Sequence, residues 1–171
     1  MDSHLPDDAR IRPATPDDAT AIVDIYNHFI RHTAVTFEVA ELSEADMRQR
    51  IAHIASGFPY LVCEAGGRLA GYSYAHPWKE REAYRRTLET TVYVAPAMQG
   101  HGIGRALMLQ LIDECRRRGF GVLIACITAD NTGSCRFHER LGFRRVSHFQ
   151  DVGEKFGRLW SVEDFQLDID R

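Results

Sequence analysis

Apolar residues recur at helical spacing in two segments near the start of the chain. From Ile22 to Ile30 they fall on one side of a helix that begins around residues 15–18, where Pro16 and two acidic residues mark its first turn. A second helix is predicted from Met47 to Ile54, because Ser43-x-x-Asp46 resembles a capping box. Two helices therefore precede most of the predicted strands.

The following segments predict strands separated by two more helices. A Gly66-Gly67 turn joins two of these strands into a hairpin. A long helix spans about 102–118, and a shorter one ends at Leu141 before Gly142. The predicted strands cover residues 9–13, 60–65, 69–75, 90–94, 122–127, 144–150 and 160–169.

This order predicts an α/β fold with one central mixed sheet and helices on both faces. The chain has 171 residues, which fits a single domain over 11–171 after a polar N-terminal tail at 1–10. Segment 76–88 is dense in charge and has no clear period.

Composition removes several classes of function. The 21 basic and 24 acidic residues leave a net charge of −3, so no overall positive field favours nucleic acid or an anionic membrane. We expect a cytoplasmic protein, since no stretch resembles a membrane span or a signal peptide. Cys63, Cys115, Cys126 and Cys135 lie singly in apolar segments and are expected to be buried, reduced thiols. We expect no metal, because His28 and His32 lack an evident third ligand.

A glycine-rich run, Gln99 to Arg105, follows the strand that ends at Val94 and opens the long helix. Glycines let backbone N–H groups approach an anion, and the helix N-terminus attracts negative charge. The run lacks the spacing of a dinucleotide fingerprint and the lysine of a Walker loop. It predicts a pyrophosphate site, with a turn that only serves helix packing as the alternative.

The spacing Gln99-x-x-Gly102-x-Gly104 resembles the acetyl-CoA loop, Q/R-x-x-G-x-G/A, of the GNAT superfamily of N-acetyltransferases. A second motif is similar: Asn131-x-x-Ser134-x-x-x-His138 continues to Gly142-Phe143, with His138 where most members carry tyrosine. The segments 77–84, 89–94 and 136–139 look like the phosphinothricin N-acetyltransferase group.

This resemblance implies a GNAT-like acyl-CoA N-acyltransferase fold, acetyl-CoA as co-substrate, a small-molecule amine as acceptor and a homodimer. The residues implied to bind acetyl-CoA are Val92, Tyr93, Val94, Gln99, Gly100, His101, Gly102, Ile103, Gly104, Arg105, Asn131 and Ser134.

Two residues are candidates for the chemical step. Glu89 shares a strand face with Thr91 and Tyr93, and partial burial of its carboxylate raises the pKa of a base that accepts the ammonium proton. His138 is a candidate acid toward the thiolate, a second base or a packing residue. The resemblance gives the oxyanion donor as a strand N–H, that of Val94.

The charged loop supplies candidates for acceptor binding. Residues 79–86 hold four basic and two acidic side chains, which suit a carboxylate, although a solvated loop remains the alternative. With aromatic residues similar to the acceptor wall of the family, the candidates are Phe37, Lys79, Arg81, Glu82 and Tyr84.

The sequence thus predicts acetyl transfer to the α-amine of a small amino-acid-like substrate of the phosphinothricin, methionine sulfoximine or methionine sulfone type. One alternative is a protein or peptide N-terminal acetyltransferase. The other is a non-catalytic acyl-CoA-binding sensor.

Overall fold

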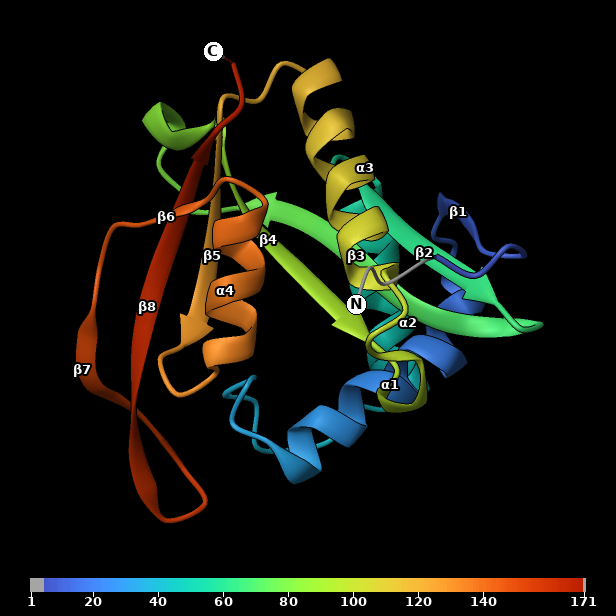
Figure 1. Ribbon diagram of the computed structural model, residues 1–171, viewed down its shortest axis with the longest axis horizontal. Helices are drawn as coiled ribbons and strands as arrows, with labels where there is room; N and C mark the ends of the chain where they lie inside the picture. The colour runs from blue at the N-terminus through green and yellow to red at the C-terminus, as the bar shows by residue number, and fades with distance from the viewer. Residues whose placement is uncertain (1–4, 171) are drawn as a thin grey trace.

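An eight-stranded sheet runs through the molecule in the order β1-β2-β3-β4-β5-β8-β6, with β7 paired to β8 (Figure 1). The computed structural model describes residues 5–170. The strands are β1 Arg10–Pro13, β2 Tyr60–Ala65, β3 Arg68–Pro77, β4 Thr87–Val94, β5 Val122–Thr128, β6 Arg144–Arg145, β7 Phe149–Lys155 and β8 Arg158–Asp168. The helices are α1 Ala19–His32, α2 Glu44–Ala55, α3 Ile103–Arg117 and α4 Thr132–Arg140, with short 3-10 turns η1 Pro16–Asp18, η2 Glu82–Tyr84 and η3 Pro96–Met98.

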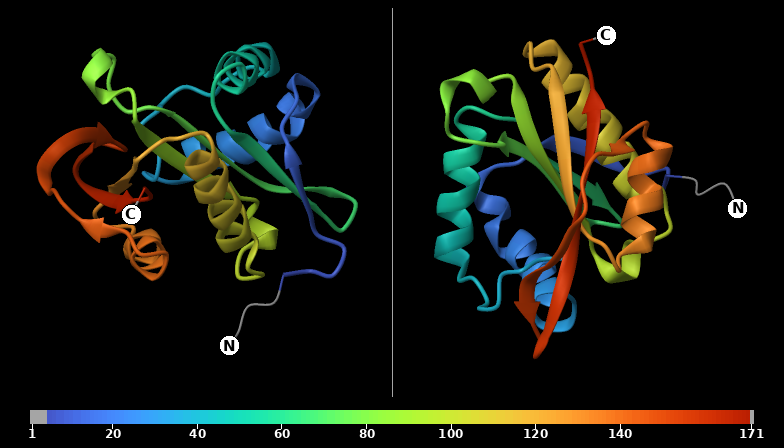
Figure 2. Two further views of the ribbon diagram at one scale, coloured as in Figure 1. Left: turned by 90° about the horizontal axis from the view of Figure 1, so that it is seen from above. Right: turned by 90° about the vertical axis from the view of Figure 1, so that its left-hand side faces the viewer.

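The helices cover both faces of the sheet, as predicted (Figure 2). One buried cluster lies between α1, α2 and the face of β2 and β3 that carries Val62 and Tyr72. The other lies under α3, whose Leu107 and Leu111 are fully buried against the opposite face. Burial of apolar side chains on both faces stabilises the central strands, since each face removes hydrocarbon from water.

The central parallel pair, β4 and β5, stays together for only a short distance. Its register ends at Glu89 opposite Ile124, and the hydroxyl of Thr90 donates to the Ile124 carbonyl at 3.3 Å. Beyond this point the two strands diverge (Figure 1). Since β4 keeps its pairing with β3 as far as Val94, the divergence opens β4 along one edge only.

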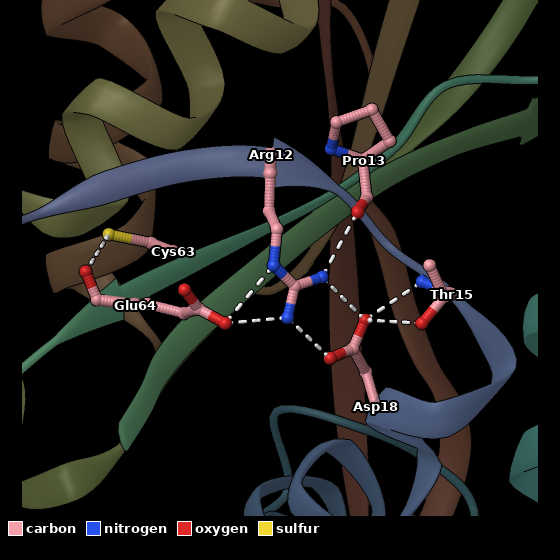
Figure 3. A network of polar contacts seen from close by, with 6 residues as sticks. All are labelled: Arg12, Pro13, Thr15, Asp18, Cys63 and Glu64. Carbon is pink, nitrogen blue, oxygen red and sulfur yellow. Dashed lines mark hydrogen bonds and ion pairs between the residues drawn. The ribbon is translucent and has the colours of Figure 1, made fainter. Parts of the chain in front are cut away.

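The N-terminal elements are joined by Arg12, whose guanidinium bonds to carboxylates on two sides (Figure 3). Its Nη2 donates to Asp18 Oδ1 at 2.7 Å and to Glu64 Oε1 at 2.6 Å, which links β1 to η1 and β2. The Arg12 hydrogen bonds lower the pKa of Asp18. The amide of Gly66 donates to Asp8 at 2.7 Å, so the described part of the predicted tail contacts the hairpin.

Most predicted elements are confirmed, including the capping box, in which Ser43 Oγ accepts from the Asp46 amide at 3.1 Å. The predicted strand at 144–150 is wrong. It breaks after Arg145, and β7 forms instead a hairpin with β8. Asp151 and Phe156 have φ of 54°, which bends the backbone at places where non-glycine residues rarely do so.

Candidate active site

A cleft of about 800 Å³ opens where β4 and β5 diverge. Its walls come from the second half of β4, the facing half of β5, the start of α3, helix α4 and the loop after α1. The cleft brings the predicted glycine-rich run, Glu89 and His138 into one cavity. Among the described residues, no helix is long and apolar enough to cross a membrane, and no group of three or more potential ligands is placed to hold a metal.

The glycine-rich run forms one end of the cleft. Gly100 and Gly102 have φ of 82° and 75°, which side chains on L-residues rarely permit, and a Cβ added at Gly100 would meet no atom within 4 Å. Gly102 is the N-cap of α3, and the first N–H groups of a helix have no intrahelical partner. Unpaired N–H donors and open space therefore lie together at the start of α3, as the binding of an anion requires.

The predicted cofactor residues lie in the wall of this cleft with one exception. His101 is exposed and is not among the residues that line the cleft, whereas Arg105 and Gln99 are. The lining residues Val92 and Val94 belong to the part of β4 that has no β5 partner. Backbone groups on that edge are free to pair with an extended ligand.

Helix α4 contributes three of the predicted residues. Asn131 caps the helix, its Oδ1 accepting from the Ser134 amide at 3.2 Å. His138 is 4 % exposed, and its Nδ1 lies 2.9 Å from the carbonyl oxygen of Ser134. A carbonyl only accepts, so Nδ1 carries the hydrogen and Nε2 holds the lone pair in the neutral ring. Burial lowers the pKa of His138, and the ring is accordingly neutral at pH 7.

Glu89 lies at the vertex of the cleft, where the β4–β5 pairing ends. Its side chain is 31 % exposed. Burial raises the pKa of Glu89 above its usual range; His76 acts in the opposite direction and Asp164 in the same direction. A carboxyl in this environment suits a general base better than a solvated carboxylate does.

Aromatic side chains line the part of the cleft beyond Glu89. Tyr93 from β4 packs against Tyr26 and Phe29 of α1, with ring centroids 5.3 and 5.1 Å apart. Phe37, predicted as an acceptor residue, lines the same region, as does Tyr74 of β3.

Sequence reasoning missed His76, which faces Glu89 across the β3–β4 pair. The alternation of Tyr72, Tyr74 and His76 carried the signal, because alternate residues of a strand share a face. That face is assigned only when the register places Tyr74 opposite Thr91.

The charged loop does not line this cleft, and its predicted role in acceptor binding stays a prediction. None of Lys79, Arg81, Glu82 and Tyr84 lines the cavity. The loop joins the start of β4, where Thr87 still pairs with Val122, and it therefore lies beyond the closed end of the cleft. Lys79 Nζ instead lies 4.0 Å from the centroid of the Trp78 ring.

Cys126 departs from the prediction that all four thiols are buried. Cys63 and Cys115 are buried, whereas Cys135 is partly buried and Cys126 is exposed to the cleft. The physical reason is the divergence of β4 and β5, which leaves one face of β5 uncovered. The sequence predicted that both faces of this apolar strand are covered.

The loop after α1, which carries Phe37, is fixed from three directions. Thr128 Oγ1 donates to the Ala34 carbonyl at 2.6 Å, Lys155 Nζ donates to the Thr36 carbonyl at 2.8 Å, and Tyr26 bonds to the Thr36 hydroxyl at 2.8 Å. A Cβ on Gly153 would lie 2.1 Å from the Phe37 ring. The β7–β8 hairpin thus sets the position of one wall of the cleft.

Comparison with known proteins places this architecture in a family. Residues 22–143 match the model of the acetyltransferase (GNAT) family, and the chain belongs to that family. It is 40 % identical over 164 residues to an L-methionine sulfoximine/L-methionine sulfone acetyltransferase of Salmonella typhimurium, covering 94 % of each chain.

Two further relatives agree with this family assignment. The chain is 41 % identical over 150 residues to a phosphinothricin N-acetyltransferase of Alcaligenes faecalis, covering 86 % of this chain and 76 % of that one. The yncA protein of Salmonella typhimurium, solved with its cofactor acetyl-CoA, superposes with a TM-score of 0.93 at 38 % identity, over 96 % of this chain and 95 % of that one.

The contact between Gly153 and Phe37 predicts a specific coupling. Gly153→Ala should lower the free energy of unfolding by about 1–3 kcal/mol, because the added methyl group overlaps the ring. In a Phe37→Ala background the same change should cost much less. Denaturant titration of the four proteins measures this, with Gly57→Ala, where the Cβ meets no neighbour, as the control. Equal costs in both backgrounds would show that Phe37 does not rest on Gly153.

Proposed function

We propose that this protein transfers the acetyl group of acetyl-CoA to the α-amine of a small amino-acid-like substrate, with Glu89 as general base. The observation that carries the proposal is the single cleft that joins the glycine-rich run to a partly buried carboxyl. The named relatives, which act on methionine sulfoximine, methionine sulfone or phosphinothricin, support this substrate type.

The residues present fit acetyl-CoA. Gly100 and Gly102 leave room for a pyrophosphate beside the N–H groups of α3, and Arg105 adds a positive charge. The open edge of β4 offers backbone partners to an extended chain, and the Val94 N–H is our candidate oxyanion donor. When bound, acetyl-CoA supplies an activated acetyl thioester.

Glu89 prepares the acceptor. An amine attacks a carbonyl carbon through its lone pair, so its ammonium form must first lose a proton. The Glu89 carboxylate accepts that proton, and its raised pKa brings its basicity closer to that required at neutral pH.

The hydrogen bond of His138 bears on the three roles left open by sequence. A neutral ring with its hydrogen on Nδ1 has no proton on Nε2 to give to the departing thiolate. The geometry supports a proton acceptor or a packing role for His138, rather than an acid.

The acceptor identity separates the proposal from its alternatives. We expect CoA thiol release with phosphinothricin, methionine sulfoximine or methionine sulfone, and little with peptides or polyamines, because aromatic side chains line the acceptor end of the cleft. A thiol-release assay with this panel measures it. Turnover of peptides alone favours the N-terminal acetyltransferase, and calorimetric binding of acetyl-CoA without turnover favours the sensor.

Cofactor binding depends on the left-handed glycine that begins α3. Gly102→Val should weaken acetyl-CoA binding at least ~10-fold, or roughly 1.4 kcal/mol, because a branched side chain strains this backbone and obstructs the approach of the anion. Calorimetry on the folded variant measures the affinity. Gly57→Val, at an open position without positive φ, is the control and should bind as the parent does. Unchanged affinity in Gly102→Val removes the loop from the site.

Removal of the Glu89 carboxylate should change rate and pH dependence together. Glu89→Gln should lower kcat at neutral pH by ~10² to 10⁴, and alkali should partly restore it by deprotonating the amine directly. In the parent, activity falls as pH falls through the raised pKa of Glu89, since the protonated carboxyl accepts no proton. The pH profile of Glu89→Gln should lack this decrease in activity at acidic pH. Glu139→Gln, exposed and outside the cleft, is the control, and a parental profile in Glu89→Gln contradicts the assignment.

We also propose that two copies associate through the β7–β8 hairpin. Four of the seven exposed large apolar side chains in the described residues lie there, namely Phe149, Val152, Phe156 and Leu159, and a fifth, Val146, lies shortly before β7. Val152→Glu should shift the sedimentation equilibrium toward monomer, because it places a charge in the apolar contact. Leu109→Glu, at an exposed leucine on α3, should not. A monomeric parent refutes the proposal.

A further inference from the structure

His76 lies directly opposite Glu89 in the antiparallel β3–β4 pair. Its Nε2 is 3.9 Å from Glu89 Oε1, and the two side chains are 33 % and 31 % exposed. The Nδ1 of His76 lies 3.0 Å from the Pro77 carbonyl, which only accepts, so Nδ1 carries the hydrogen. The neutral ring therefore turns a lone pair toward Glu89.

Four titratable groups face Glu89 from the surrounding strands. His76 and Tyr74 come from β3, Asp164 from β8 and Cys126 from β5. Tyr74, Asp164 and Cys126 carry a negative charge or none, so His76 is the group among these four that becomes positive on taking a proton. Its contact with Glu89 is also the contact that favours the carboxylate.

We propose that His76 accepts from Glu89 the proton that the carboxylate has removed from the acceptor amine, and releases it to water. This inference rests on the proposed function. In the first step an ammonium N–H bond breaks and a Glu89 O–H bond forms. In the second the O–H bond breaks and an Nε2–H bond forms, and the resulting imidazolium gives that proton to water.

The position of Glu89 in the cleft explains why a second proton-accepting group beside it is useful. A bound acceptor and acetyl-CoA would fill the cleft beside Glu89 and separate its carboxyl from bulk water there. His76 lines the same cleft from β3 and is the imidazole next to that carboxyl, with a third of its own side chain exposed. The separation of 3.9 Å is longer than a hydrogen bond, and one intervening water or a small rotation closes it.

The pair can be tested without turnover. In His76→Gln the pKa of Glu89 should rise, because glutamine takes no proton and cannot stabilise the carboxylate as the protonated imidazole does. Carbon NMR of labelled glutamate side chains follows the titration, with the Glu89 signal assigned from its loss in Glu89→Gln. His53→Gln, at an exposed position on α2, should leave the Glu89 titration unchanged. An unchanged Glu89 titration in His76→Gln overturns the proposal.

Turnover gives the second readout. In dilute buffer, His76→Gln should lower kcat at least ~10-fold, leave both KM values nearly unchanged, and recover with added imidazole. Parental kcat contradicts the relay, as does a raised acceptor KM at unchanged kcat, which identifies a binding contact instead. If the parent acetylates no amine, the proposed function fails, whereas the carboxyl titration still reports on the pair.

Discussion

The short pairing between β4 and β5 is the constraint on which the rest of the structure depends. Because backbone hydrogen bonding ends at Glu89 and Ile124, the remaining half of each strand is exposed to a cavity rather than to a neighbour. An open strand edge in a sheet interior is costly unless something fills it, since unpaired backbone groups lose water without gaining partners. The cleft keeps that edge accessible to water and to an extended ligand.

The elements that follow β4 and β5 are separated because the two strands diverge. The chain leaving β4 turns through η3 into the glycine-rich run, and the chain leaving β5 turns into α4. Both turns therefore lie at the open end of the cleft, while Glu89 lies at its vertex. The loop that carries Phe37 closes the remaining side and is held by Lys155 of β7. Rigid strands thus position a site that is built from loops and helix ends.

The sequence was sufficient to predict an element where interactions between neighbouring residues determine its structure. Residues close together in the chain determine the capping box at Ser43, the Gly66-Gly67 hairpin and the start of α3 at the glycine-rich run, and all three elements form where they were predicted. Composition alone does not tell which end of β4 opens, so it could not place the charged loop relative to the cleft.

Two other features needed the three-dimensional register. His76 becomes a partner of Glu89 only when β3 and β4 are aligned, and no short-range pattern fixes that alignment. The sequence did not predict the bounds of β7, because Asp151 and Phe156 adopt positive φ angles that non-glycine residues rarely adopt. The long-range hydrogen bond from Lys155 Nζ to the Thr36 carbonyl, and the bond from Trp160 Nε1 to the Lys155 carbonyl within the hairpin, maintain it instead.

The Cys126 thiol that lines the cleft has a consequence for the order of chemical events. Although the residue is exposed to the cleft, the walls around the thiol shield it from bulk water and, with Asp164 and Glu89 nearby, raise the pKa of Cys126 to about 12. A thiol attacks as its thiolate, so Cys126 stays protonated at neutral pH and is a poor covalent carrier of an acyl group. Desolvation and the nearby carboxylates thereby disfavour an acyl intermediate on Cys126, and the direct transfer that we propose predicts initial-rate lines that intersect rather than run parallel.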